Sequence, residues 1–163
     1  MPSKRPARPD VTPAGQLAEA KLHFVLGYQL AQASIVTHDL FLRHAGKPFG
    51  LKPVEYTVLT LIAENPGGSL VRLARALSVT APNITALVDR LEAKGLVART
   101  ASKKDRRAQV LQVTKSGAEL VRETTQRIVA AEKLALALTP GEQTILAELL
   151  HKVACARDAV VPG

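Results

Sequence analysis

Apolar residues recur every three or four positions along most of the chain, a spacing that predicts helices. Between residues 15 and 44 the spacing predicts one long helix, and its apolar positions fall on more than one side. They include Leu22, Leu26, Leu30, Ala33, Thr37 and Leu40. A helix that is apolar on several sides needs several neighbours. We therefore expect one neighbour of this helix to be another subunit.

Three shorter helices are predicted after a loop at residues 46–51. Pro53 suits the first position of a helix, and Asn65-Pro66-Gly67-Gly68 ends it. The buried stripe expected for this helix is Val54, Val58, Leu61 and Ile62. Helices near residues 70–78 and 80–94 follow, joined by a tight turn, with Thr80 as the N-cap of the second. Two helices joined in this way form a helix-turn-helix pattern.

The spacing changes to two after Leu96, which predicts strands. One strand begins at Val97 and a second covers residues 110–113, with a highly charged stretch at residues 102–107 between them. Together they predict a β-hairpin with a basic tip.

Two helices are predicted to end the chain. The first carries apolar and small residues at alternating steps of three and four, a seam suited to a partner helix. They are Val121, Thr124, Ile128, Ala131, Ala135 and Leu138. Thr139 and Glu142 have the spacing of a capping box, with Pro140 at the first position of the last helix.

Composition narrows the class of partner. The 163 residues include 22 Lys and Arg against 14 Asp and Glu, for a formal net charge of +8, which suits a polyanion. Residues 1–14 are rich in proline and basic residues, and we interpret them as a flexible basic arm. The sequence contains no apolar run long enough for a bilayer and no signal peptide, so we expect a cytoplasmic protein. Aromatic residues are only 3%, which argues against stacking on single-stranded nucleic acid.

The helix-turn-helix followed by a basic hairpin indicates duplex DNA. With Ile84, Leu87, Val88 and Leu91 turned inward, the second helix presents a small, polar outer face. Asn83 could pair with adenine, and Arg90 with guanine or phosphate. The predicted DNA contacts are Thr80, Pro82, Asn83, Thr85, Ala86 and Arg90 on the helix, and Lys103, Lys104, Arg106 and Arg107 on the hairpin.

The stretch from Leu51 to Leu120 resembles the MarR family of bacterial transcriptional regulators. The resemblance rests on PVEYTVL at residues 53–59, LARAL at 73–77, VDRLEAKGLV at 88–97, and Asp105-Arg106-Arg107 before LQVTKSG at 111–117. It implies a mainly α fold in which a winged helix-turn-helix is flanked by long dimerisation helices. The expected division is an arm at 1–14, a dimerisation helix at 15–50, a DNA-binding region at 51–117, and dimerisation helices at 118–163.

The family resemblance also implies a homodimer that binds a pseudo-palindromic operator, with Arg106 or Arg107 entering the minor groove. Thr80 stands where many members have an acidic residue that pairs with the hairpin arginine, and Ala86 where many have a basic one. The family's small-molecule crevice would be framed here by Tyr28, His38 and Tyr56. The expected function is a sequence-specific regulator, a repressor released by a small effector such as an aromatic acid.

Three other functions fit the sequence less well: general DNA packaging, enzyme activity and membrane-surface binding. An architectural protein that binds all DNA alike would share the charge but would not need the polar helix face. No nucleophile–base pair, paired carboxylates or phosphate loop suggests an enzyme. Membrane-surface binding fits poorly, because the basic residues lie on a hairpin and not on an amphipathic helix. We expect no cofactor and no metal, and we interpret Cys155 as a buried structural thiol near the stripe of the last helix.

Overall fold

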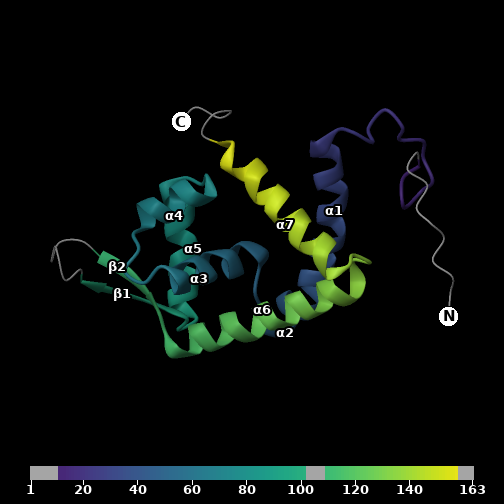
Figure 1. Ribbon diagram of the computed structural model, residues 1–163. Coiled ribbons are helices and arrows are strands. Elements are labelled where there is room, and N and C mark those ends of the chain that lie inside the picture. The colour runs from purple at the N-terminus through teal and green to yellow at the C-terminus, as the bar shows by residue number, and fades with distance from the viewer. Residues whose placement is uncertain (1–10, 102–108, 158–163) are drawn as a thin grey trace.

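Helices account for most of the computed structural model, which describes residues 11–101 and 109–157 (Figure 1). The helices are α1 (Leu26–Phe41), the π-helical turn η1 (Leu42–Gly46), α2 (Lys47–Phe49), α3 (Pro53–Glu64), α4 (Leu70–Leu77), α5 (Ala81–Ala93), α6 (Lys115–Ala135) and α7 (Pro140–Cys155). The strands β1 (Val97–Ala101) and β2 (Gln109–Val113) form an antiparallel hairpin. The predicted fold class, a mainly α protein with a β-hairpin wing, is confirmed.

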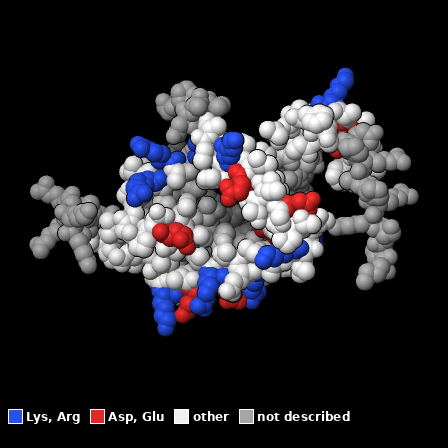
Figure 2. All heavy atoms as spheres, in the orientation of Figure 1, with Lys and Arg blue, Asp and Glu red and all other residues white. Residues whose placement is uncertain are grey.

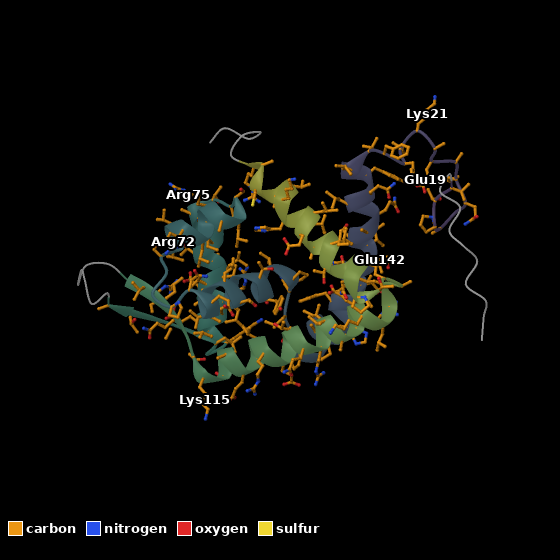
Figure 3. All side chains as sticks on the ribbon, in the orientation of Figure 1. Glu19, Lys21, Arg72, Arg75, Lys115 and Glu142 are labelled. Carbon is orange, nitrogen blue, oxygen red and sulfur yellow. The ribbon has the colours of Figure 1, made fainter. Side chains whose placement is uncertain are left out.

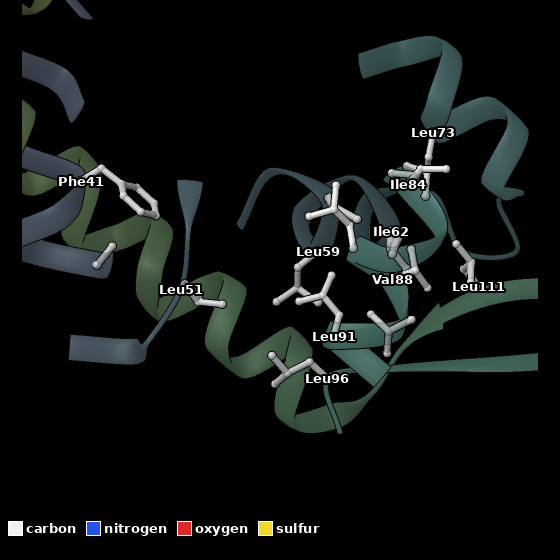
Figure 4. Close-up of a cluster of buried hydrophobic side chains, with 14 residues drawn as sticks. Phe41, Leu51, Leu59, Ile62, Leu73, Ile84, Val88, Leu91, Leu96 and Leu111 are labelled. Atoms are coloured by element: carbon white, nitrogen blue, oxygen red, sulfur yellow. The ribbon is translucent and has the colours of Figure 1, made fainter. Parts of the chain in front are cut away.

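The core lies where α3 crosses α5 next to the hairpin (Figure 4). The predicted inner face of α5 is confirmed, since Ile84, Leu87, Val88 and Leu91 are all buried. The stripe predicted on α3 is partly wrong, because Val54 is exposed and Leu59 is fully buried in its place. Val54 sits in the first turn of α3, where the neighbouring Glu55 and not Val54 faces α5.

The hairpin is fixed to the helix-turn-helix at its base. Val97 pairs with Val113, and Leu111 also exchanges backbone hydrogen bonds with the segment before α4. Gly67 N donates to Leu111 O at 3.0 Å, and Leu111 N donates to Gly68 O at 3.1 Å. The hairpin is therefore held on both sides.

The N-terminal region differs from the prediction at both ends. The first helix begins at Leu26 and not near Gly15, because residues 15–25 form turns in which Leu17 and Phe24 are exposed and pack on no core. Residues 46–51 are not a simple loop, since the helical path continues through η1 and α2 as far as Phe49. Gly46 is buried there, and a Cβ at this position would meet Leu51 O at 3.2 Å. Glycine serves in this position for close packing and not for a turn. Of the predicted arm at 1–14, residues 1–10 lie outside the described residues.

The seam predicted on α6 finds its partners within the same chain. Thr124 and Ala131 are buried, and Val121 and Ile128 pack against the core beside α1, η1 and α3. The start of α6 touches the base of the hairpin at Gly117, where a Cβ would lie 2.2 Å from Leu96 O. That contact leaves no room for a side chain.

The last helix stands apart from the core (Figure 1). Its predicted capping box is confirmed, with Thr139 N donating to Glu142 Oε2 at 2.7 Å. None of its residues is buried, and its predicted apolar stripe is exposed. The exposed apolar residues of α1 and α7 include Leu26, Leu30, Ile35, Val36, Ile145, Leu146, Leu149, Leu150 and Val153. Within 11–101 and 109–157, no helix has the length and apolar character needed to cross a bilayer.

Candidate DNA-binding surface

The N-terminal half of α5 presents an exposed surface without charge. Thr80 is the N-cap residue, as predicted, although its side chain makes no capping bond. Pro82, Asn83 and Ala86 are exposed beside it. Thr85 is half-buried, and its hydroxyl donates to Ala81 O at 2.8 Å, which leaves its oxygen free to accept. This surface offers an amide and several methyl or methylene groups to a partner.

The C-terminal half of α5 is tied to α3 through a buried carboxylate. Glu55 has a side chain that is only 3% exposed, and it faces two cations of α5. Arg90 Nε lies 3.4 Å from Glu55 Oε1, and Lys94 Nζ lies 3.0 Å from Oε2. Lys94 Nζ also donates to Gly50 O at 3.0 Å, which joins α5 to the end of α2. The sequence motifs placed these residues in separate stretches and gave no sign that they meet.

The pKa of Glu55 is lowered by its surroundings. Burial alone would raise the pKa, because the charged form loses water. The hydrogen bond from Lys52 N at 3.1 Å, the hydrogen bond and charge of Lys94, and the bond from Arg90 together outweigh that cost. Glu55 is thus held as a carboxylate.

Arg99 on β1 connects the hairpin to the outer side of α5. Its guanidinium is ion-paired with both Asp89 and Glu92, which lie one turn apart on α5. Its charge is offset in this position by two carboxylates. The two ion pairs link β1 of the hairpin to α5.

Two arginines of α4 add a positive surface that the sequence motifs did not single out. Arg72 and Arg75 are exposed, and Figure 3 shows both on the outer end of the helix-turn-helix. Basic side chains gather over α4 in the space-filling view (Figure 2). Among the described residues, neither arginine has an ion-pair partner. The sequence signal that could have identified them is their spacing of three on a strongly amphipathic helix, which places both on its polar face. The predicted hairpin contacts Lys103, Lys104, Arg106 and Arg107 lie outside the described residues.

The predicted ligand residues occupy three different settings. Tyr28 is hydrogen-bonded to Glu19, which raises the pKa of the phenol, and His38 is exposed on α1. Tyr56 packs its ring against Phe41 and shares a hydrogen bond of 2.7 Å with Thr125 on α6. No contact joins these three side chains to one another.

A groove of about 680 Å³ opens between the end of α3 and α6. Its lining combines small apolar residues with Glu64, Arg122, Gln126 and Lys133. Thr125 lines the groove as well, so the hydroxyl of Tyr56 reaches its wall through Thr125. Arg122 and Lys133 were not singled out from the sequence, because solvated cations on a helix are common.

Cys155 is exposed, so the expectation of a buried thiol is wrong. No element of the described ranges covers the last helix, and its stripe is exposed. Cys155 Sγ lies 3.6 Å from His151 Nε2. Within the described ranges, no three His, Cys, Asp or Glu side chains cluster as a metal site.

The packing of α3, α4 and α5 around one core, with the hairpin beside α5, defines a winged helix-turn-helix protein, the class to which many transcriptional regulators belong. The sequence pattern of the MarR family matches residues 49–108. A putative transcriptional regulatory protein for the hcr operon of Thauera aromatica is 30% identical over 150 residues, covering 91% of this chain and 89% of the relative. An HTH-type transcriptional repressor of Mycobacterium tuberculosis is 32% identical over 129 residues, covering 78% of this chain and 92% of the relative.

Solved structures agree with these relatives. The transcriptional repressor CouR bound to a 23-mer DNA duplex has 31% identity and a TM-score of 0.74, covering 85% of this chain and 98% of that one. CouR from Rhodococcus jostii RHA1 bound to p-coumaroyl-CoA has 25% identity and a TM-score of 0.72, covering 89% and 98%. The chain belongs to the MarR family of transcriptional regulators, and its relatives are regulators and not enzymes.

Proposed function

We propose that this protein is a sequence-specific repressor that binds double-stranded operator DNA. The observation that carries the proposal is the exposed, uncharged N-terminal half of α5 next to the cations of α4. A recognition helix reads base edges in the major groove while the preceding helix crosses the phosphate backbone. Asn83 would contact a base, and Arg72 and Arg75 would contact phosphates. The similarity to CouR, which was solved on a DNA duplex, supports this reading.

The proposed active form is a homodimer. The apolar side chains of α1 and α7 are exposed in one chain, and burying them against a second copy would remove them from water. Two recognition helices related by a two-fold axis require a pseudo-palindrome with half-sites about 10 bp apart. A protein with this function acts where bacterial DNA lies, so we propose a cytoplasmic location.

The groove between α3 and α6 is the proposed effector site. Its apolar lining and the cations Arg122 and Lys133 suit an elongated molecule with an apolar body and an anionic end. CouR was solved with p-coumaroyl-CoA, which joins an aromatic acyl end to a phosphate-bearing end. Tyr56 would act through Thr125, while Tyr28 and His38 would contact the part of the ligand nearest α1. Effector binding would release the operator.

Selection of bound sequences from random duplex DNA tests the proposal. The expected result is an enriched pseudo-palindrome whose affinity falls when Asn83 is replaced by alanine, by about 1–3 kcal/mol for one base contact. Asn65→Ala is a matched control, because Asn65 ends α3 and its side chain bonds only to Leu61 O. Equal affinity for all duplexes would instead identify an architectural protein.

A further inference from the structure

Glu55 combines features that helix packing alone does not require. It is a nearly fully buried carboxylate, and both of its cationic partners lie on the helix proposed to read DNA. We propose that Glu55 is a positioning residue for DNA recognition, which orients Arg90 toward the operator and offsets the positive charges of Arg90 and Lys94. This inference rests on the proposed DNA-binding function.

The carboxylate of Glu55 is itself held in a fixed place. It accepts a hydrogen bond from Lys52 N at the N-terminus of α3, where a helix favours negative charge. Lys94 then bridges Glu55 and the carbonyl of Gly50. The Glu55 carboxylate therefore connects α3 directly to α5, and Lys94 extends the connection to the end of α2.

Arg90 is bound to Glu55 in a way that leaves part of the guanidinium available. Only Nε faces Glu55, at 3.4 Å, and the side chain is 49% exposed. The two terminal nitrogens carry the remaining N–H donors of the fork. An arginine oriented in advance loses less conformational entropy when it binds than one that is free to rotate. The contact with Glu55 should therefore favour the operator geometry over other DNA.

The charge of Glu55 acts in the same direction. Lys and Arg residues attract any duplex by releasing counterions, whatever its sequence. A carboxylate within 3.4 Å of Arg90 and 3.0 Å of Lys94 weakens that general attraction. Glu55 should thus lower binding to random DNA while it supports binding to the operator.

The experiment measures affinities for the selected duplex and for a random duplex by fluorescence anisotropy at several salt concentrations. The full chain carries Glu55→Gln, which keeps an oxygen for Lys52 N and removes the charge. We expect random-duplex affinity to rise several-fold, the operator-to-random ratio to fall about tenfold, and the salt slope to steepen by about one unit. Glu55→Asp should restore part of the ratio.

Glu123→Gln is the matched control. It removes the same charge from the exposed ion pair with Arg127 on α6, away from α5. The operator-to-random affinity ratio and the salt slope of this variant should stay close to those of wild type. Equal changes in Glu55→Gln and Glu123→Gln, or a ratio unchanged in Glu55→Gln, would overturn the role of Glu55.

Arg90→Lys keeps the proposal testable if Glu55→Gln does not fold. Lysine keeps the charge but has no Nε to be oriented by Glu55, so the ratio should fall with little change in salt slope. An unchanged ratio in this variant overturns the proposal. A wild-type protein that selects no sequence would contradict the proposed function itself, which separates the two failures.

Discussion

Tyr56 on α3 donates a hydrogen bond of 2.7 Å to Thr125 on α6, across 69 positions of sequence. The direction follows from Thr125, whose single hydroxyl hydrogen is given to Val121 O at 2.7 Å. Thr125 therefore accepts from Tyr56. The bond links the DNA-binding region to the helix that lines the proposed effector groove.

Tyr56→Phe should lower the free energy of unfolding by about 1 kcal/mol, the usual net value of one such bond. Urea denaturation measures the change. Tyr28→Phe is the control, because the bond of Tyr28 to Glu19 joins the first turn of α1 to the turns before it and lies away from the core. An equal loss in both variants would contradict a special role for the Tyr56 bond.

Gly117→Ala should destabilise the protein by about 1–3 kcal/mol, the range for overpacking a filled site. The new Cβ would lie 2.2 Å from Leu96 O and 2.8 Å from Val113 Cγ2, so the hairpin base or α6 must shift. Gly141→Ala is the opposite control, since no atom lies within 4 Å of a Cβ there and a small gain is expected. Thermal unfolding of the two variants should move in opposite directions.

Acid should weaken the fold through Glu55. Because the pKa of Glu55 is lower in the folded protein, its bonds stabilise fully above the ordinary glutamate pKa, and this contribution is lost as the pH falls through the folded value. The stability difference between wild type and Glu55→Gln should therefore shrink on acidification. Glu132 supplies the reverse case, because burial raises its pKa. In urea unfolding, Glu132→Gln should have the same free energy of unfolding as wild type in acid. As the pH rises, its free energy of unfolding should become larger than that of wild type.

Arg99→Ala should weaken binding to every duplex while changing stability by about 1 kcal/mol or less. Its partners Asp89 and Glu92 are 55% and 38% exposed, so solvent screens much of the attraction. Without Arg99, two uncompensated carboxylates would remain beside the DNA surface and repel phosphates. Arg127→Ala on α6 is the control, and similar DNA affinities for the two variants would contradict this account.

Leu149→Lys should disrupt the proposed dimer. Leu149 on α7 is 55% exposed in one chain, and a buried lysine at the interface would be costly. Sedimentation should show wild type at twice 17.4 kDa and the variant at 17.4 kDa. Val71→Lys changes a more exposed apolar residue on α4, at 70%, and should leave the dimer intact. A wild-type monomer at micromolar concentration would contradict the dimer.

The helix-turn-helix was predictable from the sequence because local signals and burial agree there. The inner face of α5 repeats at helical spacing, Thr80 and Pro82 mark its start, and the hairpin alternates with a period of two. The first helix was less predictable. Apolar spacing continues through residues 15–25, yet within the described residues they join no buried core, and they adopt turns.

The candidate site was predicted only in part, because its ion pairs join distant segments. The exposed positions of α5 follow from helix geometry, and Asn83 and Ala86 lie on the outer face as expected. The pairing of Glu55 with Arg90 depends on how α3 crosses α5, which no local pattern encodes. The same holds for Arg99, whose pairing with Asp89 and Glu92 depends on how the hairpin lies against α5.

The close contact of Gly117 with Leu96 also anchors the start of α6 to the base of the hairpin. This contact would be the pivot if the rest of α6 moved. Thr114 strengthens the pivot, since its hydroxyl accepts from Gly117 N at 3.0 Å and donates to Gly95 O at 2.8 Å. The part of α6 from Gly117 to Ala135 is about 27 Å long, at 1.5 Å per residue. A displacement of about 2 Å at its far end would tilt the hairpin by about 4° if α6 moves as a rigid rod. A small ligand beside α6 would then change where the hairpin meets DNA.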